Sequence, residues 1–356
     1  MQSSAQTAPF RIAVLPGDGI GPEVMRAAIH VLEKVQSCVP GLKLIFDEHA
    51  AGAGEFQRSG DPLPEHVRLA CHRADAVLLG AMGLPCVRWP DGRELTPQID
   101  LREIFQLYQG IRPVFLYHQA DCPLKHYKPG EIDLVIVRES TEGLFSTRLR
   151  AIDPAADAAT DQLLVTRERS QQLFHAAFQL ARTRRRHLTL VDKANVLPSM
   201  VFFRRIFDEV AEHYSDVTTN RLYVDAASLL LVRQPTDFDV IVTENMFGDI
   251  LSDLAAALVG GMGMAPSADI GDDTAVFQPC HGTAPDLIGR GIANPIAMVL
   301  SAAMMLEWLD SDASRAAALR IRRAVTSVMR DPSIRTPDMG GSRTTVQITA
   351  AIVDAM

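Results

Sequence analysis

Short apolar runs alternate with amphipathic segments along most of the chain, and this alternation constrains the fold more than any other feature. The runs, rich in β-branched residues, occupy residues 11–15, 42–46, 75–80, 132–137, 187–192 and 238–242. Helical periodicity follows several of them, as in residues 65–71 and 166–181. Buried strands that alternate with helices predict a parallel sheet covered by helices on both faces. The expected fold class is therefore α/β.

Length and composition narrow the class of protein further. A chain of 356 residues exceeds what one hydrophobic core usually serves, so two domains or subdomains are expected. A net charge of −8 argues against a nucleic-acid or anionic-membrane partner, and no apolar run approaches the length of a membrane span. The five cysteines lack metal-binding spacing, which fits a reducing compartment. Residues 1–9 show no secretion-signal pattern, and the expected location is cytoplasmic.

A pair of acidic residues follows the apolar run at residues 238–242. Asp249 and Asp253 are four positions apart in a segment with helical periodicity, so a helix would place both carboxylates on one face, about 6 Å apart. Such a pair is repulsive unless a cation lies between the two groups. Two interpretations remain open from spacing alone, a solvated helix face and a site for a hard divalent cation.

A glycine-rich loop, residues 17–21, joins the first apolar run to a helical segment. The strand, loop and helix suggest a dinucleotide-binding fold, but the spacing is G-x-G-x-G where the fingerprint requires G-x-G-x-x-G. The spacing favours a tight turn that leads into a helix.

Three arginines and one lysine lie at the ends of predicted elements. Arg102, Arg112 and Arg138 could converge on substrate carboxylates, although any one alone is more typical of a surface. Lys193 follows an apolar run, where burial would lower its pKa and make it a candidate base; a surface lysine is the alternative. Asp225 supplies an acid at the start of another helix.

Seven motifs, taken together, resemble the β-decarboxylating dehydrogenase family, which includes isopropylmalate, isocitrate, homoisocitrate and D-malate/tartrate dehydrogenases. They lie in family order at residues 17–24, 101–113, 138–143, 192–197, 243–253, 281–286 and 291–295. The resemblance implies an isopropylmalate-dehydrogenase-like fold with two subdomains that share a central sheet, not a Rossmann fold. A large subdomain would comprise residues 1–107 and 250–356, and a small one residues 108–249.

The resemblance also implies roles for the charged residues. Arg102, Arg112 and Arg138 would bind substrate carboxylates. Asp249 and Asp253 would hold Mg²⁺ or Mn²⁺. From the second subunit of a homodimer, Asp225 would add a metal ligand and act in catalysis, and Lys193 would be a catalytic group.

The resemblance further implies a nucleotide cofactor and a reaction. The adenosine half of the cofactor would bind at His281, Gly282, Thr283, Ala284, Asp286 and Asn294. A carboxylate at Asp286 accepts hydrogen bonds from ribose hydroxyls and repels a 2′-phosphate, which favours NAD over NADP. The implied activity is the NAD-dependent oxidative decarboxylation of a 3-carboxy-2-hydroxy acid, of the 3-isopropylmalate type.

Departures from the family pattern leave the substrate open. Phe145 stands where the family usually has a tyrosine that protonates the enol. Thr96 and Gln98, with Ile99, stand at the positions that recognise the variable substituent, and they match neither the isopropylmalate nor the isocitrate pattern well. Gln278 replaces a common glutamate. D-malate/tartrate dehydrogenase, isocitrate dehydrogenase and a catalytically silent paralogue are therefore the alternatives.

Overall fold

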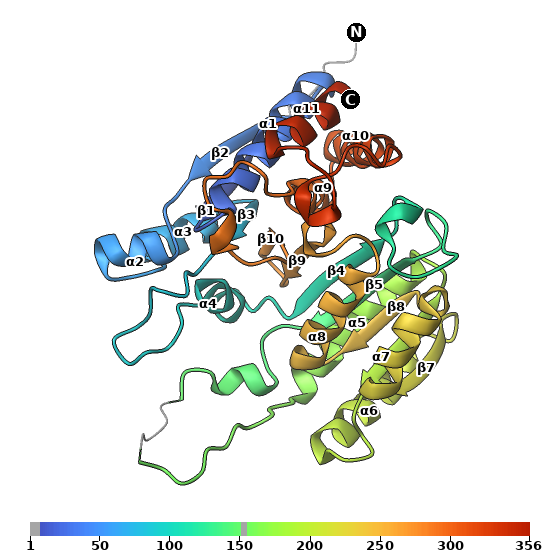
Figure 1. Ribbon diagram of the computed structural model, residues 1–356. Helices are drawn as coiled ribbons and strands as arrows, with labels where there is room; N and C mark the ends of the chain where they lie inside the picture. The colour runs from blue at the N-terminus through green and yellow to red at the C-terminus, as the bar shows by residue number, and fades with distance from the viewer. Residues whose placement is uncertain (1–7, 151–154) are drawn as a thin grey trace.

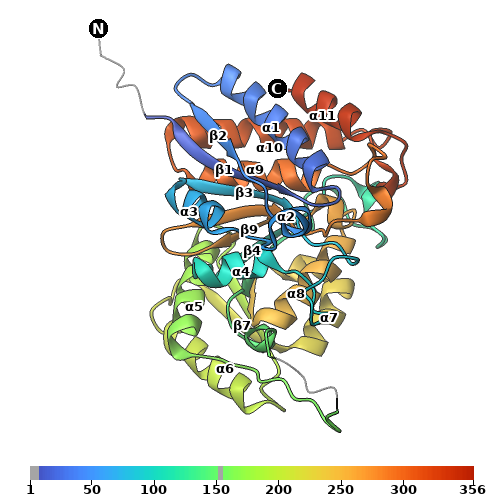
Figure 2. The same cartoon turned by 90° about the vertical axis from the view of Figure 1, so that its left-hand side faces the viewer.

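One ten-stranded sheet runs through the whole molecule (Figures 1 and 2). The computed structural model describes residues 8–150 and 155–356, so most of the segment expected to lack a secretion signal lies outside it. The strand order is β2-β1-β3-β10-β9-β4-β5-β8-β6-β7. The strands are β1 (Phe10–Gly17), β2 (Leu44–Glu48), β3 (Ala76–Ala81), β4 (Gln109–Phe115), β5 (Asp133–Glu139), β6 (His187–Asp192), β7 (Thr218–Tyr223), β8 (Val240–Thr243), β9 (Pro266–Ile270) and β10 (Ala275–Pro279).

The sheet is mixed, which corrects the expectation of a parallel one. Strands β2, β1, β3 and β10 are parallel, and so are β5, β8, β6 and β7. Between these two groups, β9 pairs antiparallel with both β10 and β4, and β4 pairs antiparallel with β5. The antiparallel pairings join two parallel halves into one continuous sheet.

Helices cover both faces of each half, as expected. They are α1 (Gly21–Cys38), α2 (Ala53–Ser59), α3 (Glu65–Arg73), α4 (Pro97–Ile104), α5 (Arg167–Arg182), α6 (Pro198–Ala211), α7 (Val224–Arg233), α8 (Asn245–Ala257), α9 (Ile296–Trp308), α10 (Asp312–Met329) and α11 (Thr345–Asp354). The first and last helices of the chain lie side by side in both views, so the N- and C-terminal segments build the same half (Figures 1 and 2).

Strict alternation within the strands explains this two-sided covering. In β1, Ile12 and Val14 pack in the core formed with α1, α9 and α10, whereas Ala13 and Leu15 pack toward α3 and α4. The other half repeats the pattern, with one core between the sheet and α5 and α6 and another under α7 and α8. Successive side chains of a strand point to opposite faces, so a run that is apolar throughout must be buried on both.

One local expectation needs correction. Arg112, expected at the end of an element, lies within strand β4, whereas α4 ends at Ile104, whose side chain is exposed. The expected subdomain boundaries fall just before β4 and inside α8, which is continuous across residues 249–250. Within the described residues, no helix combines the length and apolarity needed to cross a membrane.

Candidate active site

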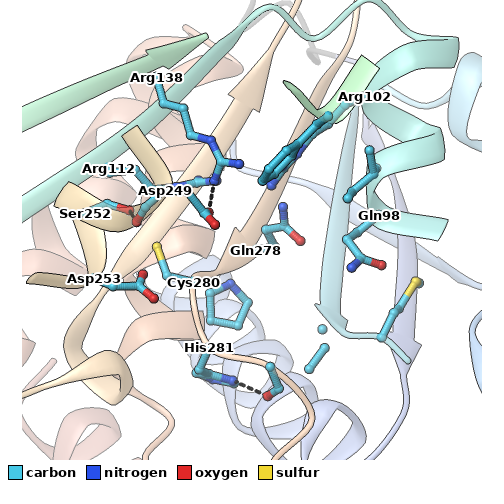
Figure 3. Close-up of a pocket in the computed structure, with 17 residues that line it drawn as sticks. Gln98, Arg102, Arg112, Arg138, Asp249, Ser252, Asp253, Gln278, Cys280 and His281 are labelled. Atoms are coloured by element: carbon cyan, nitrogen blue, oxygen red, sulfur yellow. Dashed lines mark hydrogen bonds and ion pairs between the residues drawn. The ribbon is translucent and has the colours of Figure 1, made fainter. Parts of the chain in front are cut away.

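A cavity of about 230 Å³ lies where the two halves of the sheet meet. Helix α8 supplies Asp249, Ser252 and Asp253 on one side, and α4 supplies Gln98 and Arg102 on the opposite side (Figure 3). The remaining described residues of its lining come mainly from β3, β4, β5 and the segment that begins in β10: Gly80, Ala81, Met82, Ile99, Arg112, Arg138, Phe145, Gln278, Pro279, Cys280, His281 and Gly282. Elements far apart in the sequence therefore converge on one polar cavity.

Arg138 is held in the cavity wall by α8. Its Nε and Nη2 donate to Asn245 Oδ1 at 3.0 and 2.7 Å, and its Nη1 forms an ion pair with Asp249. Burial and the neighbouring Arg102 guanidinium lower the pKa of Arg138 to about 10. Gly248 makes this approach possible, because a Cβ there would lie 2.6 Å from Arg138 Cγ. The glycine that interrupts the acidic motif thus gives the arginine side chain its space.

The two acidic residues of α8 share one helix face, as their spacing predicts. Asp249 is half exposed and pairs with Arg138, whereas Asp253 has no such ion pair among the described residues. Burial, and next the charge of Asp249, raise the pKa of Asp253. A cation bound between the two carboxylates would remove that repulsion, and carboxylate oxygens are the donors that Mg²⁺ and Mn²⁺ prefer. The donor set fits such an ion.

Behind the cavity wall, Asp269 of β9 is fully buried between two of the arginines. Its carboxylate lies 3.1 Å from Arg102 Nε and 3.4 Å from Arg112 Nη2. Gln278 Nε2 also donates to Asp269 Oδ2 at 2.6 Å. Burial alone would raise the pKa of Asp269, but the three arginines outweigh it and hold the pKa below its usual value. Sequence reasoning missed this residue because β9 was not recognised as a strand.

Several buried polar atoms of the lining have no hydrogen-bond partner in the described structure. They are Gln98 Oε1, Arg112 Nη1 and His281 Nε2, whereas Arg102 Nε faces the Asp269 carboxylate. Buried donors and acceptors are rarely left unpaired, because each costs about 1–3 kcal/mol when desolvated without a partner. One guanidinium donor and two acceptors, since the neutral His281 ring donates through Nδ1 to the Gly282 carbonyl, indicate a site for a polar ligand in this arginine-lined cavity.

The residues expected to hold the cofactor form one irregular segment after β10, with one exception. His281 and Gly282 line the cavity, Thr283 is buried, and Asp286 is exposed further along. Burial lowers the pKa of His281, so its ring is neutral near pH 7. Asn294 lies outside residues 281–286: its side chain is buried, accepts from Ile296 N at 3.1 Å and donates to Asp338.

The glycine-rich loop after β1 packs against this segment. Ile20 N donates to Thr283 O at 3.0 Å, and a Cβ on Gly19, where φ is +62°, would lie 2.2 Å from the same oxygen. Asp18 accepts from Ala53, Gly54 and Gly83 backbone amides and so fixes the loop. The loop is thus a rigid support for residues 281–286, consistent with the tight turn that its spacing favours.

The positions expected to determine substrate specificity lie at the start of α4. Gln98 and Ile99 line the cavity, whereas Thr96 precedes the helix and is outside the lining. Phe145 also lines the cavity, with its ring centroid 5.3 Å from the Arg138 guanidinium carbon. The ring offers no proton to the cavity, and it covers the arginine that a substrate carboxylate would approach.

Lys193 and Asp225 lie outside this cavity within the same chain. Lys193 follows β6, Asp225 lies in the first turn of α7, and their side chains form an ion pair. The hydrogen bond from Lys193 lowers the pKa of Asp225, whose side chain is two-thirds exposed. Among the described residues, no three His, Cys, Asp or Glu side chains are grouped closely enough to hold a metal ion. One chain therefore supplies two of the three expected metal ligands at the cavity.

The mixed α/β sheet, with an arginine- and aspartate-lined cavity between its halves, defines the fold class of decarboxylating hydroxy-acid dehydrogenases. The sequence profile of the isocitrate/isopropylmalate dehydrogenase family matches residues 11–356, and the chain belongs to that family. The 3-isopropylmalate dehydrogenase of Moorella thermoacetica is 44% identical over 339 residues, 93% of each chain, and that of Aquifex aeolicus is 40% identical over 338 residues, covering 93% of this chain and 91% of the other.

Solved structures show the same fold. Isocitrate dehydrogenase from Methylococcus capsulatus superposes with a TM-score of 0.88 at 37% identity, covering 97% of this chain and 99% of the other. A β-decarboxylating dehydrogenase from Thermococcus kodakarensis has a TM-score of 0.80 at 38% identity, covering 97% and 96%. The expected family and its α/β fold, distinct from a Rossmann fold, are confirmed.

Proposed function

We propose that the protein catalyses the NAD-dependent and Mg²⁺- or Mn²⁺-dependent oxidative decarboxylation of a 3-carboxy-2-hydroxy acid, of the 3-isopropylmalate type. The observation that carries the proposal is the cavity itself, whose lining combines Arg102, Arg112 and Arg138 with the carboxylates Asp249 and Asp253 and with unpartnered polar atoms. Relatives named 3-isopropylmalate dehydrogenase, at 40–44% identity, support the reaction class.

The arginines would bind and orient the substrate. Guanidinium groups bind carboxylates through paired hydrogen bonds, and the burial of Arg102 and Arg112 removes the competing water. Arg138 would exchange its ion pair with Asp249 for a substrate carboxylate, which frees Asp249 for the metal. The bound metal would stabilise negative charge that develops on the substrate's hydroxyl oxygen.

Proton transfer would require a second copy of the chain. Lys193 would first give up its ammonium proton to water; as the neutral amine, with Asp225 beside it, it would then accept the hydroxyl proton across the subunit interface as hydride passes to the nicotinamide. Exposed apolar side chains of Leu229, Val232 and Ile250 on α7 and α8 support an interface at this face, because a monomer would leave them in water. The proposed assembly is a homodimer in which each active site is shared between the two copies. Each copy has a large subdomain, residues 1–107 and 250–356, and a small subdomain, residues 108–249.

NAD would bind along residues 281–286, with Asn294 supporting the segment. The exposed carboxylate of Asp286 would accept hydrogen bonds from the ribose hydroxyls of NAD and repel the 2′-phosphate of NADP. The proposed location is the cytoplasm, where such metabolic substrates and a reducing environment occur together.

A second candidate is a D-malate/tartrate dehydrogenase, and Gln98 favours tartrate as its substrate. The Oε1 of Gln98 is buried at the cavity and lacks a partner, so it could accept a hydrogen bond from the C3 hydroxyl of tartrate. An isopropyl group would leave that oxygen unpaired, at a cost of about 1–3 kcal/mol. Neighbouring Ile99 favours an apolar substituent instead.

The test is an assay of NADH formation with Mn²⁺ on 3-isopropylmalate, D-malate, tartrate and isocitrate, with NAD or NADP and with CO₂ measured separately. We expect NADH and CO₂ in equal amounts from one of the dicarboxylic acids, and none without the divalent metal. An absence of both turnover and metal-dependent binding for all four acids would leave a catalytically silent paralogue and refute the proposal.

A further inference from the structure

Asp269 is a buried negative charge placed behind the substrate arginines. It lies 3.1 Å from Arg102 Nε and 3.4 Å from Arg112 Nη2, and it is not part of the cavity lining. Ser140 Oγ donates to the same carboxylate at 3.4 Å. Asp269 therefore cannot touch a substrate, yet it shares two of the groups that would bind one.

Gln278 of β10 is a neutral hydrogen-bond donor next to the Asp269 carboxylate. Gln278 Nε2 donates to Asp269 Oδ2 at 2.6 Å, and Gln278 itself reaches the cavity lining. A glutamate at position 278 would bring a second carboxylate to that distance inside a buried site, where like charges repel strongly. A neutral amide at this position and a carboxylate at 269 form a compatible pair.

The charge of the lining depends on Asp269. Arg102, Arg112 and Arg138 are the only lysine or arginine side chains among the described residues of the lining, and the ring of His281 is neutral. A divalent metal would balance Asp249 and Asp253, and Lys193 and Asp225 of a second copy would balance each other. Asp269 cancels one of the three arginine charges, which leaves two positive charges for the substrate.

We propose that Asp269 is a specificity-determining residue that adjusts the site to a dicarboxylate and disfavours a tricarboxylate. The proposal rests on the function proposed above and specifies its substrate class. Asp269 acts through the arginines as a positioning residue: it holds Arg102 and Arg112 in place and reduces the net charge that they present. A third substrate carboxylate would enter without a positive charge to meet it.

The effect should appear in the ratio of two affinities. A unit charge about 10 Å away, at an effective dielectric constant near 20, changes the binding of one further carboxylate roughly tenfold. Loss of Asp269 charge should strengthen binding of a trianion more than that of a dianion, because the trianion carries one more negative charge. A purely structural role would change both affinities in parallel.

The experiment compares the wild type with Asp269→Asn by calorimetric titration of the Mg²⁺-loaded protein with 3-isopropylmalate, D-malate and isocitrate. We expect the ratio of the isocitrate Kd to the tighter dicarboxylate Kd to fall about tenfold in the variant. The double variant Asp269→Asn/Gln278→Glu moves the negative charge to the adjacent strand and should restore the wild-type ratio.

Asp239→Asn is the matched control. Asp239 is also a buried aspartate that pairs with an arginine, Arg184, but it lies outside the cavity lining. This variant should leave the Kd ratio unchanged. An unchanged ratio in Asp269→Asn, or a wild type that binds isocitrate as tightly as the dicarboxylates, would overturn this inference alone. No metal-dependent binding of any of the acids to the wild type would instead overturn the proposed function and this inference together.

Discussion

Substituting Gly248 by alanine tests whether this glycine exists to accommodate Arg138. The added methyl carbon would lie 2.6 Å from Arg138 Cγ and 2.7 Å from its Cβ, whereas carbon atoms pack at about 3.5–4.0 Å. The arginine stem must therefore move by about 1 Å. Its bonds to Asn245, now 3.0 and 2.7 Å, would then exceed hydrogen-bonding distance or lose their geometry.

The magnitude follows from the bonds at risk. A hydrogen bond to a charged group contributes about 1.5–3 kcal/mol, so a displaced Arg138 should weaken substrate binding by roughly 10- to 150-fold. Alanine is a better helix former than glycine by about 1 kcal/mol, which opposes any loss of stability. We expect a large rise in KM with only a small change in the melting temperature.

The assay is NADH formation against the concentration of the acid on which the wild type is most active, with thermal unfolding measured alongside. Gly54→Ala is the matched control, because Gly54 also lies in a helix and its added Cβ would meet only Asp18 Oδ1, at an ordinary 3.6 Å. A Gly248→Ala variant with unchanged KM and a higher melting temperature would refute the reasoning.

Three further predictions address the shared site, the missing proton donor and a buried acid. The Lys193→Ala and Asp253→Asn variants should each be inactive alone, but an equal mixture should regain about a quarter of wild-type activity after subunit exchange. Half of the dimers would then be hybrids, each with one intact site. No recovery of activity would contradict a site shared between subunits. Phe145→Tyr should raise the rate of turnover, with NADH and CO₂ still formed in equal amounts, because a phenol could give the enol its proton; an unchanged kcat would show that the ring does not limit enol protonation. Burial raises the pKa of Glu139 to about 7, so the folded state retains a proton that the unfolded state loses near pH 4.5. The free energy of unfolding should therefore fall by roughly 3 kcal/mol as the pH rises from about 4.5 to about 7. Urea unfolding should show a weaker pH dependence of this free energy for Glu139→Gln, and an equal pH dependence in both proteins would refute the assignment.

The strands that are apolar throughout could be predicted from the sequence, and β9 could not. Strands such as β3 and β8 are buried on both faces, so their composition alone indicates them. Segment Pro266–Ile270 contains a proline, a serine and an aspartate, and its place in the sheet depends on pairing with β10 and β4. Periodicity therefore could not identify Asp269, although it is buried and pairs with two arginines of the site.

Local spacing placed the two acids of α8 on one helix face, but it could not place Arg138 beside them. That contact depends on β5 pairing with β8 and on the space above Gly248, which are properties of the assembled sheet. The family pattern supplied the three arginines as a group, and the structure adds Asp269 as the buried partner that two of them, Arg102 and Arg112, share. The structure of one chain does not bring Lys193 and Asp225 to the cavity, because the site that they are expected to complete lies in a second copy.

The order of strands has a consequence for synthesis of the chain. Strands β3 and β4 are consecutive in sequence, yet β9 and β10, which begin only at residues 266 and 275, lie between them in the sheet. A nascent chain that ends before residue 266 would hold two sheet fragments, each with an unpaired edge. Closure of the sheet depends on contacts between distant parts of the sequence, which are slow to form. The strand that brings Asp269 to the arginines is thus also among the last to be made, so the cavity and the continuous sheet are completed together.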